Sequence, residues 1–574
     1  MLQEIISKAR GLEKCDLVLR NARVVNVFSS EIIETDVAIF GDKIIGLGSG
    51  YEAHEEVDLK GLYLAPGFID GHLHIESSMV EVPQFTRAVL PLGTTSVVAD
   101  PHEIANVLGY EGIRYMMESS KYNPLNVFFM LSSCVPSTPL ETAGSELRAF
   151  DIFPFLREKW VLGLGEMMNY PGVLNADSDV LDKLKIVSNK RIDGHAPGLS
   201  GKDLNAYIAA GVQSDHECTT VDEALEKLRL GMYIMIREGT GTKNLLDLLP
   251  LVNKENERRI FFCTDDRHPN DILEEGHINF MIRSAIKYGI DPMTAIRMAT
   301  LNTAEYFGLH HIGAIGPGRL ADMVAFEDLE NIEVRQVYKN GKMVALDGIP
   351  IYDLPARPKT PIRGSVNIKW LEGDEFKIPA NGSRCRVIGI VPHQIVTKSL
   401  EMDCSIQDGY VVTDVDRDII KIFVVERHRA TGNIGKGLIK GFGMKRGAIA
   451  SSIGHDSHNI IVVGVSDEDV FKAVTSINKM GGGIAVVNDG KVIESLELPI
   501  AGLMSNKPLE FVSSRMKSLI EATRTLGTTL DDPLMTLSFM ALPVIPSLKL
   551  TDTGLVDVEK FEHVGLFLDG KSEE

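Results

Sequence analysis

The stretch Ala65-Pro66-Gly67-Phe68-Ile69-Asp70-Gly71-His72-Leu73-His74 is an apolar run that ends in two histidines with one residue between them. Side chains alternate between the two faces of a β-strand, so residues two apart share a face. We therefore expect His72 and His74 to point the same way from the end of a strand. Two imidazoles side by side on a rigid element are suited to binding one divalent metal ion. Two histidines can also alternate by coincidence, so the rest of the chain has to decide.

The bulk properties describe an ordinary globular protein with several domains. Of 574 residues, 44% are hydrophobic and 24% are charged, and a chain of this length is expected to form two to four domains. The net charge of −20 argues against a nucleic-acid partner, which needs a basic surface. No apolar run is long enough to span a bilayer and residues 1–10 have no signal-peptide core, so we expect no membrane partner and a cytoplasmic location.

The six cysteines are scattered along the chain, and none belongs to a Cys-x-x-Cys pair. This pattern indicates neither a disulfide framework nor a zinc–thiolate cluster. It also excludes the zinc deaminases whose ligand signature combines H-x-E with P-C-x-x-C.

From residue 65 onward, apolar runs typical of strands alternate with helical patterns, which predicts βα units and a parallel sheet. Helix signals between the runs include capping boxes at 220–223 and 200–203. Eight such units over about 250 residues have the size of a (β/α)8 barrel. The eight runs are 64–69, 94–100, 126–132, 161–166, 191–195, 212–216, 233–238 and 260–265.

The segments around the predicted barrel indicate two further folding units. Short strands before residue 64 and again between 313 and 341 predict a small β-sandwich built from both sides of the barrel. Proline-rich residues 350–361 are typical of a linker. A helix pattern at 467–480 and a hairpin signal at 489–490 predict a C-terminal α+β domain. The predicted domains are 1–64 with 312–362 for the sandwich, 65–311 for the barrel and 363–574 for the C-terminal domain.

Residues that bind metals or move protons follow nearly every predicted barrel strand. The C-terminal ends of barrel strands converge at one face, where catalysis takes place. Nitrogen and oxygen ligands without thiolate suit Mn²⁺, Fe²⁺ or Zn²⁺, and two such ions sharing a carboxylate turn a bridging water into a hydroxide nucleophile. The six residues expected to form this binuclear site are His72, His74, Glu166, His195, His216 and Asp265. Asp265 can also accept the proton of the water and pass it to a leaving group.

These residues at these strand ends resemble the amidohydrolase superfamily. Longer strings resemble, more narrowly, the bacterial and archaeal adenine deaminases of that superfamily, and together they cover essentially the whole chain. The strings are Asp100-Pro101-His102-Glu103-Ile104-Ala105-Asn106-Val107, Gly165-Glu166-Met167-Met168-Asn169-Tyr170-Pro171-Gly172, Asp193-Gly194-His195-Ala196-Pro197, Ser214-Asp215-His216-Glu217, Thr264-Asp265-Asp266-Arg267-His268-Pro269, Gly454-His455-Asp456-Ser457-His458-Asn459 and Leu498-Pro499-Ile500-Ala501-Gly502-Leu503-Met504.

The resemblance implies the hydrolytic deamination of adenine to hypoxanthine and ammonia by a hydroxide that bridges two metal ions, as a step of purine salvage. It implies manganese or iron in preference to zinc, and a homo-oligomer, with a dimer as the expectation. It also implies that Glu166 is the bridging ligand, where many relatives carry a carboxylated lysine.

Attack on the purine carbon C6 requires a proton on the adjacent ring nitrogen, so a carboxylic acid is expected there. Glu217, Glu238 and Glu103 are the candidates, and a structural ion pair is the competing interpretation for each. Asp265 is expected to protonate the departing amine. The candidate substrate contacts are His102, Glu103, Arg237, Asp266 and His268. His455 and His458 are expected to lie in a polar loop that packs on the barrel, in preference to binding metal or reaching the active site.

Two other functions are compatible with the same sequence. One is hydrolysis of a cyclic amide by a hydantoinase-like or dihydroorotase-like enzyme, and Glu166 in place of a carboxylated lysine argues against it. The other is a barrel without catalytic activity that serves as a binding or assembly module, and the unbroken set of metal ligands argues against that.

Overall fold

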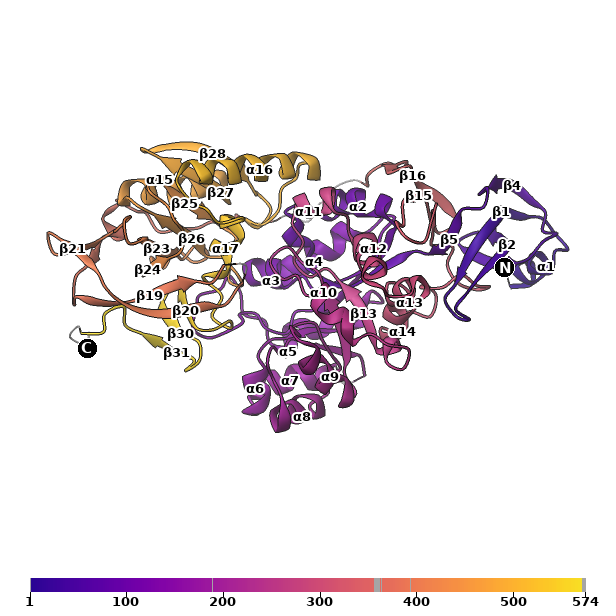
Figure 1. The fold of residues 1–574 in the computed structure, drawn as a ribbon, viewed down its shortest axis with the longest axis horizontal. Coiled ribbons are helices and arrows are strands. Elements are labelled where there is room, and N and C mark those ends of the chain that lie inside the picture. The colour runs from indigo at the N-terminus through magenta and orange to yellow at the C-terminus, as the bar shows by residue number, and fades with distance from the viewer. Residues whose placement is uncertain (1, 188, 356–361, 363, 393, 570–574) are drawn as a thin grey trace.

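The computed structural model describes residues 2–187, 189–355, 362, 364–392 and 394–569. Figure 1 shows three regions in a row: an N-terminal sheet at one end, a parallel α/β region in the middle and a C-terminal domain at the other end. Within the described ranges, no helix is both long enough and apolar enough to cross a membrane.

The N-terminal sheet takes strands from both sides of the parallel region. Among the described residues its nine strands are β1 (Cys15–Asn26), β2 (Glu31–Phe40), β3 (Lys43–Leu47), β4 (Ala53–Asp58), β5 (Tyr63–Pro66), β14 (Met323–Phe326), β15 (Val334–Lys339), β16 (Lys342–Leu346) and β17 (Ile349–Pro350). The two halves meet where β5 pairs antiparallel with β14. All nine strands are hydrogen-bonded into one sheet. Because a single sheet can fold over to form two layers, this pairing neither confirms nor contradicts the two-layer sandwich, which stays a prediction.

The middle region contains eight parallel strands, divided in the described part of the chain between two sheets. The five-stranded sheet has the order β10 (Arg191–Gly194), β9 (Val161–Met167), β8 (Asn126–Leu131), β7 (Thr94–Ala99), β6 (Phe68–Leu73). The three-stranded sheet has the order β11 (Ser214–Asp215), β12 (Tyr233–Arg237), β13 (Ile260–Cys263). Each overlaps one predicted run, and the run 64–69 is divided between β5 and β6.

Gly67 is the point at which the first predicted run changes sheets. Its amide donates to the carbonyl of Asp322, 2.9 Å away, which directly precedes β14 of the N-terminal sheet. A Cβ at this position would collide with the side chain of Thr95. The chain therefore passes from β5 into β6 without a loop, because only a glycine allows so close an approach.

Backbone hydrogen bonds join the two parallel sheets at both of their edges. On one side, the amide of Asp265 donates to the carbonyl of His72 at 3.0 Å, and the amide of His74 donates to the carbonyl of Asp265 at 3.2 Å. On the other side, the amide of Gln213 donates to the carbonyl of Ile192 at 3.0 Å. The carboxyl ends of β6 and β13, distant in sequence, are thereby held side by side.

The helices between these strands follow local signals in the sequence. α9 (Val221–Arg229) begins where the Thr220 hydroxyl accepts the amide of Glu223 at 3.3 Å, a capping bond expected from the Thr-x-x-Glu spacing. α8 (Gly201–Ala209) follows Ser200, whose side chain makes no capping bond. The first capping signal is therefore used and the second is not.

The C-terminal domain is built on an eight-stranded sheet, counted over the described residues. Its order is β20 (Thr397–Asp403), β19 (Arg384–Ile390), β24 (Ile434–Lys440), β23 (Ile419–Val425), β26 (Ile460–Gly464), β25 (Ala448–Ser451), β27 (Gly483–Asn488), β28 (Lys491–Glu497). Helix α15 (Asp467–Met480) lies over one face, and α16 (Leu509–Thr525) and α17 (Pro533–Phe539) pack with the other. The predicted linker at 350–361 falls partly outside the described residues, which omit 356–361.

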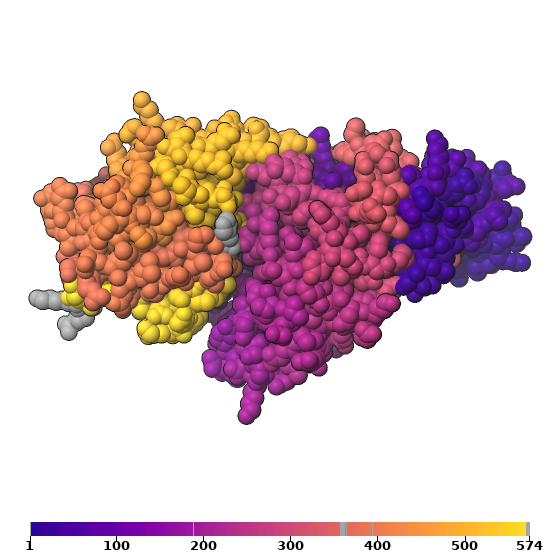
Figure 2. Space-filling view, viewed as in Figure 1, coloured from indigo at the N-terminus to yellow at the C-terminus, as the bar shows by residue number. Residues whose placement is uncertain are grey.

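A single apolar core connects the C-terminal domain to the parallel region. It includes Leu73 and Val97 from the parallel strands, Ile422 and Ile461 from the C-terminal sheet, and Met516 from α16. The space-filling view in Figure 2 shows the C-terminal domain in direct contact with the middle region. The carboxyl ends of the parallel strands are consequently covered by this domain, which decides what the site beneath it looks like.

Candidate active site

Six side chains from the ends of five parallel strands converge under the C-terminal domain. His72 and His74 come from the end of β6, Glu166 from β9, and His195, His216 and Asp265 from the residues that follow β10, β11 and β13. Three overlapping groups have one ligand atom per residue within 4.8 Å of the others: His72, His74 and Glu166; His72, His216 and Asp265; Glu166, His195 and His216. The six residues expected to share metal ions thus lie together.

Glu166 lies at the centre of this cluster. Its Oε1 is 3.2 Å from Nε2 of His74, whereas its Oε2 is 2.6 Å from Nδ1 of His195 and 3.2 Å from Nε2 of His216. Each carboxylate oxygen therefore faces a different set of imidazoles. This is the arrangement that a carboxylate needs in order to bridge two ions.

The imidazoles present free nitrogens to this centre. The Nδ1 of His74 is 2.9 Å from the carbonyl oxygen of Asp100, so Nδ1 donates and Nε2 is left for a ligand bond. Among the described residues, both ring nitrogens of His72 and of His216 are buried without a hydrogen-bond partner. Buried polar atoms without partners are unfavourable, and a bound divalent cation would satisfy them. The residues present therefore fit the metal centre that their identities predict.

Burial and charge set the protonation of the cluster. Burial raises the pKa of Glu166, but contacts with His102, His195 and other imidazoles outweigh it and hold that pKa well below its usual range. Burial, with repulsion from His216, lowers the pKa of His72 to about 4. Glu166 and His72 are thus in the forms that bind metal ions, an ionised carboxylate and a neutral imidazole. Burial opposes protonation of His74 and His216 too, but contacts with carboxylates raise the pKa of both well above the usual range, so a metal ion that binds there would displace their protons.

Asp265 is held between the histidine pair and an arginine. Its Oδ1 is 3.4 Å from Nε2 of His72 and 3.2 Å from Nε2 of His74, while its Oδ2 accepts from Nη1 of Arg237 at 2.9 Å. The backbone of Asp265 has a φ of 55°, in the left-handed region that non-glycine residues rarely adopt. Such strain is maintained where the surroundings fix a functional side chain.

Glu217 forms a two-pronged pair with Arg237. Nη2 of Arg237 donates to Oε2 of Glu217 at 3.0 Å, and Nη1 contacts Oε1. Oε1 also lies 3.4 Å from Nε2 of His216 and 3.6 Å from Nδ1 of His195. Although burial opposes it, the charge of Arg237 holds the pKa of Glu217 below its usual range. Glu217 is therefore a carboxylate beside the candidate metal ligands.

The remaining candidates from the sequence divide into two groups. His102, Glu103, Arg237 and Asp266 line the same cavity as the ligands, and Nδ1 of His102 is 3.1 Å from Oε1 of Glu166. Glu238 does not belong to that lining: its carboxylate accepts the amide of Leu245 at 3.1 Å, where the next helical turn begins.

His268 is the other candidate that the structure places outside the catalytic cavity. It lines a neighbouring cavity, and its Nδ1 lies 3.6 Å from Asp532 of the C-terminal domain. Both Glu238 and His268 follow parallel strands, so their sequence positions resemble those of the true lining residues. Their side chains point in other directions than those of the lining residues. The sequence of a short loop does not determine these directions.

The C-terminal domain provides the wall opposite the candidate metal ligands. Its apolar lining residues are Ile395, Phe539, Leu542, Val544 and Ile545, and its polar ones are His455 and Asp456. The cavity has about 440 Å³ of empty space, part of which is open to solvent. The sequence string at 454–459 drew attention to this loop, but nothing in the sequence marked the apolar residues.

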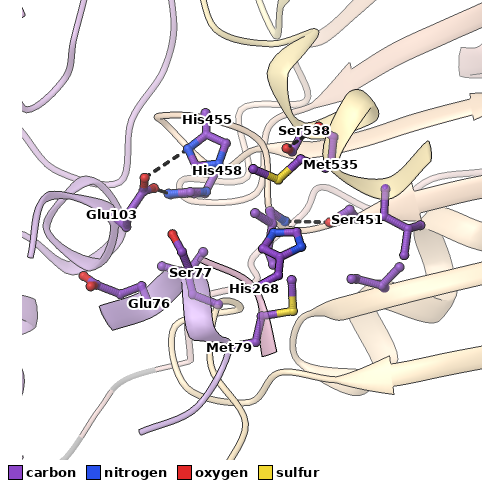
Figure 3. Close-up of a pocket in the computed structure, with 14 residues that line it drawn as sticks. Glu76, Ser77, Met79, Glu103, His268, Ser451, His455, His458, Met535 and Ser538 are labelled. Atoms are coloured by element: carbon purple, nitrogen blue, oxygen red, sulfur yellow. Dashed lines mark hydrogen bonds and ion pairs between the residues drawn. The ribbon is translucent and has the colours of Figure 1, made fainter. Parts of the chain in front are cut away.

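Figure 3 shows the neighbouring cavity, which shares Glu103 and His455 with the catalytic one. Glu103 comes from α3 (His102–Leu108) and points at two histidines of the C-terminal domain: its Oε1 lies 3.0 Å from Nδ1 of His455, and its Oε2 contacts Nε2 of His458. The loop at 454–459 thus packs on the parallel region and at the same time reaches the active site.

Comparison with known proteins agrees with this geometry. The amidohydrolase family model matches residues 63–344, and the model of the adenine deaminase C-terminal domain matches residues 394–562. The chain is 51% identical over 568 residues to adenine deaminase 2 of Carboxydothermus hydrogenoformans, covering 99% of this chain and 100% of that protein. It is 52% identical to the adenine deaminase of Desulfatibacillum aliphaticivorans, covering 98% and 99%.

A solved structure of enamidase, an amidohydrolase superfamily member, aligns with 57% of this chain and 96% of its own at 18% identity and a TM-score of 0.45. A score at this level carries no argument about function, whereas the full-length identities above do.

Proposed function

The chain belongs to the adenine deaminase family of the amidohydrolase superfamily, and from this membership we infer that it is a metal-dependent hydrolase that converts adenine and water to hypoxanthine and ammonia. The observation that carries this conclusion is about 50% identity over nearly the full length of curated adenine deaminases. The alignment with these relatives includes both the catalytic region and the C-terminal domain. The inference of adenine as the substrate therefore does not rest on the catalytic region alone.

We propose that the eight parallel strands close into a (β/α)8 barrel spanning residues 65–311, with the N-terminal sheet from 1–64 and 312–362 and the C-terminal domain at 363–574. The backbone bonds that join the five-stranded and three-stranded sheets at both edges support a closed barrel. Catalytic residues then lie at the carboxyl ends of the strands, where this fold carries its chemistry.

We propose two divalent ions, Mn²⁺ or Fe²⁺ with Zn²⁺ permitted, held by His72, His74, Glu166, His195, His216 and Asp265. The nitrogen and oxygen donors and the unpartnered buried imidazoles support this assignment. When bound, such ions lower the pKa of water, which supplies the nucleophile for attack on C6 of the purine. His102 lies against Glu166 and orients that carboxylate.

Asp265 is proposed to take the proton from the attacking water and to deliver it to the departing amine. Its contact with Arg237 keeps it ionised before the reaction, as a proton acceptor must be. Its backbone is fixed by the hydrogen bonds to His72 and His74, so the carboxylate is already positioned before the substrate binds. One water oxygen replaces one amine nitrogen, and the two protons of the water leave with the products.

Of the three acids considered for the ring nitrogen, Glu217 is the one that we propose. Glu238 lies outside the cavity, and Glu103 is engaged by His455 and His458. Because Arg237 keeps its pKa low, Glu217 enters the reaction as a carboxylate. It can therefore transfer to the ring nitrogen only a proton that it has first accepted from the attacking water.

Incubation of manganese-loaded protein with adenine tests the function directly. We expect stoichiometric ammonia release and the absorbance change of adenine turning into hypoxanthine, with metal-free protein as the control. Turnover of hydantoin or dihydroorotate without turnover of adenine would instead establish the cyclic-amide alternative. Homo-oligomerisation and a cytoplasmic location stay predictions, which light scattering and cell fractionation address.

A further inference from the structure

The catalytic cavity has two walls of opposite character. The parallel region contributes the charged ligands, whereas the C-terminal domain contributes a mainly apolar wall that includes Phe539 and Ile395. Lys549, fully buried in β29 (Leu548–Thr551), donates to the carbonyls of Ile395 at 2.7 Å and Phe539 at 2.9 Å. The apolar wall is therefore a fixed surface, suited to the flat face of an aromatic base.

Asp456 is the exception on this wall. It is 3% exposed, and its Oδ2 is buried with no hydrogen-bond partner among the described residues. Its other oxygen, Oδ1, lies 3.8 Å from Nδ1 of His455. A buried carboxylate oxygen without a donor is unfavourable, so a ligand that brings an N–H group would be bound there.

The loop that carries Asp456 is firmly held. Arg427, which is fully buried, donates to the carbonyls of Ser452 at 3.4 Å and Ala501 at 3.1 Å and contacts the carbonyl of His458. The ring of His455 stacks on Phe539 with centroids 4.6 Å apart and an angle of 10°. Asp456 is thus positioned from both sides and is not a side chain free to turn toward solvent.

The chemistry of the substrate matches this carboxylate. An unsubstituted purine carries one N–H on its five-membered ring, whichever of the two ring nitrogens holds the proton. A purine substituted on a nitrogen of that ring, such as 9-methyladenine or a nucleoside, has no such N–H. A carboxylate accepts hydrogen bonds and donates none when ionised, so it distinguishes the two classes by the presence of one donor.

We propose that Asp456 is a specificity-determining residue whose carboxylate accepts the N–H of the five-membered ring, so that the enzyme selects the free base over N-substituted purines. The C-terminal domain then does more than cover the metal centre, because it also contributes to substrate specificity. This inference rests on the proposed function, since it takes a purine as the ligand.

Asp456 has one competing role. Its carboxylate, His102 and Glu103 have ligand atoms within 4.8 Å of one another, which is compatible with an additional metal ion. The two roles differ in a measurable way: a metal ligand changes the metal content when it is replaced, and a substrate contact does not.

The test compares adenine with 9-methyladenine in the full-length, manganese-loaded protein. We expect wild type to prefer adenine in kcat/KM, and we expect Asp456→Ala to reduce that preference by about 10- to 100-fold, the loss of one hydrogen bond to a charged group. Most of the change should appear in KM for adenine. Asp456→Asn, which keeps an acceptor and the side-chain shape, should lose less, and Asp456→Glu should recover part of the preference.

Two matched variants separate this effect from general damage. Thr242→Val removes another unpartnered polar atom of the cavity lining, Oγ1 of Thr242, and should leave the ratio between the two substrates unchanged. Asp469→Asn alters another buried aspartate, in α15, that accepts the amide of Gly490 outside the cavity. It should change neither the ratio nor the metal content.

The proposal is overturned if Asp456→Asn and Asp456→Ala keep the wild-type preference, or if either loses metal in plasma mass spectrometry while the preference is kept. If Asp456→Ala does not fold, Asp456→Asn decides. If wild type does not turn over adenine at all, the proposed function fails. Calorimetric binding of adenine and 9-methyladenine then still tests Asp456: equal affinities in wild type would overturn the inference, and a preference lost in Asp456→Asn would support it.

Discussion

Glu166 shows how much one side chain depends on its neighbours. Its two oxygens face different imidazoles, and Gly165 before it allows β9 to approach the carboxylate of Asp100, with which a Cβ at 165 would collide. The residue is fully buried among charged groups, where a carboxylate is stable only with compensating cations. Its surroundings therefore fit a bridging ligand better than an isolated acid.

Glu166→Gln tests the bridge. An amide offers one acceptor oxygen in place of two charged ones, so we expect the variant to lose most of one of its two metal equivalents. Plasma mass spectrometry after manganese loading and gel filtration measures this. Asp469→Asn is the matched control, and an unchanged metal content in Glu166→Gln would show that Glu166 is not the bridge.

Asp265→Asn tests proton transfer separately from metal retention. The amide preserves the shape of the side chain but cannot accept a proton, so we expect kcat to fall by about 10²- to 10⁴-fold with most of the metal still bound. Stopped-flow or steady-state ammonia release, with metal content measured on the same sample, checks both parts. Near-normal turnover would remove Asp265 from the proton transfer.

At the scale of secondary structure, one strand of the C-terminal domain supports the cavity wall. β29 carries Lys549, whose amine is fully buried and hydrogen-bonded only to carbonyls among the bonds found in the described structure. Burial lowers the pKa of Lys549 to about 7. In the unfolded chain the same amine has an ordinary pKa near 10.4, so folding releases its proton between these two values.

The sign of the pH dependence follows from that difference. Between pH 7 and about 10 the unfolded chain binds the proton and the folded chain does not, so stability rises with pH, by at most about 1.4 kcal/mol per pH unit. Urea unfolding of wild type and Lys549→Met at pH 7.5, 8.5 and 9.5 measures it. We expect the difference in unfolding free energy to change with pH in favour of wild type, because methionine has no proton to release. Parallel pH profiles would contradict the assignment.

For the whole molecule, the shared apolar core leads us to expect that the proposed metal centre and the C-terminal domain stabilise each other. The core runs without a break from the parallel strands to the C-terminal sheet, and the ion pairs of Glu103 with His455 and His458 cross the same boundary. We therefore expect metal binding to raise the free energy of unfolding of the C-terminal domain as well as that of the parallel region.

Removal of the metal tests this coupling. A ligand that binds only the folded state stabilises it by about 2.7 kcal/mol at 100 times its dissociation constant, which corresponds to about 5–10 °C in Tm for a domain of 150–250 residues. We expect a chelator to lower Tm by this order in calorimetry and manganese to restore it. The shift should be smaller in Glu166→Gln. A Tm that does not respond to the chelator would contradict the metal assignment for wild type.

The sequence by itself determined the types of residue at the strand ends and the family to which they belong. The convergence of His72, His74, Glu166 and Asp265 could be predicted because strand alternation and the meeting of parallel strand ends are local or regular features, whereas their role as metal ligands stays a prediction. The same reasoning placed Glu238 and His268 among the candidates, because a position after a strand does not fix the direction of a side chain in the following loop.

The covering wall was decided only by the tertiary structure. Asp456 and Phe539 reach a cavity whose ligands lie up to several hundred residues earlier in the chain, and contacts at that separation leave no periodic signal in either segment. The apolar residues of the wall look like any other core residues in sequence, since burial against a neighbouring sheet and burial against a substrate demand the same side chains. The residue types at the strand ends thus indicate the chemistry of the site. The shape of the cavity, and with it the selectivity that we propose, depends on how the C-terminal domain packs on those ends.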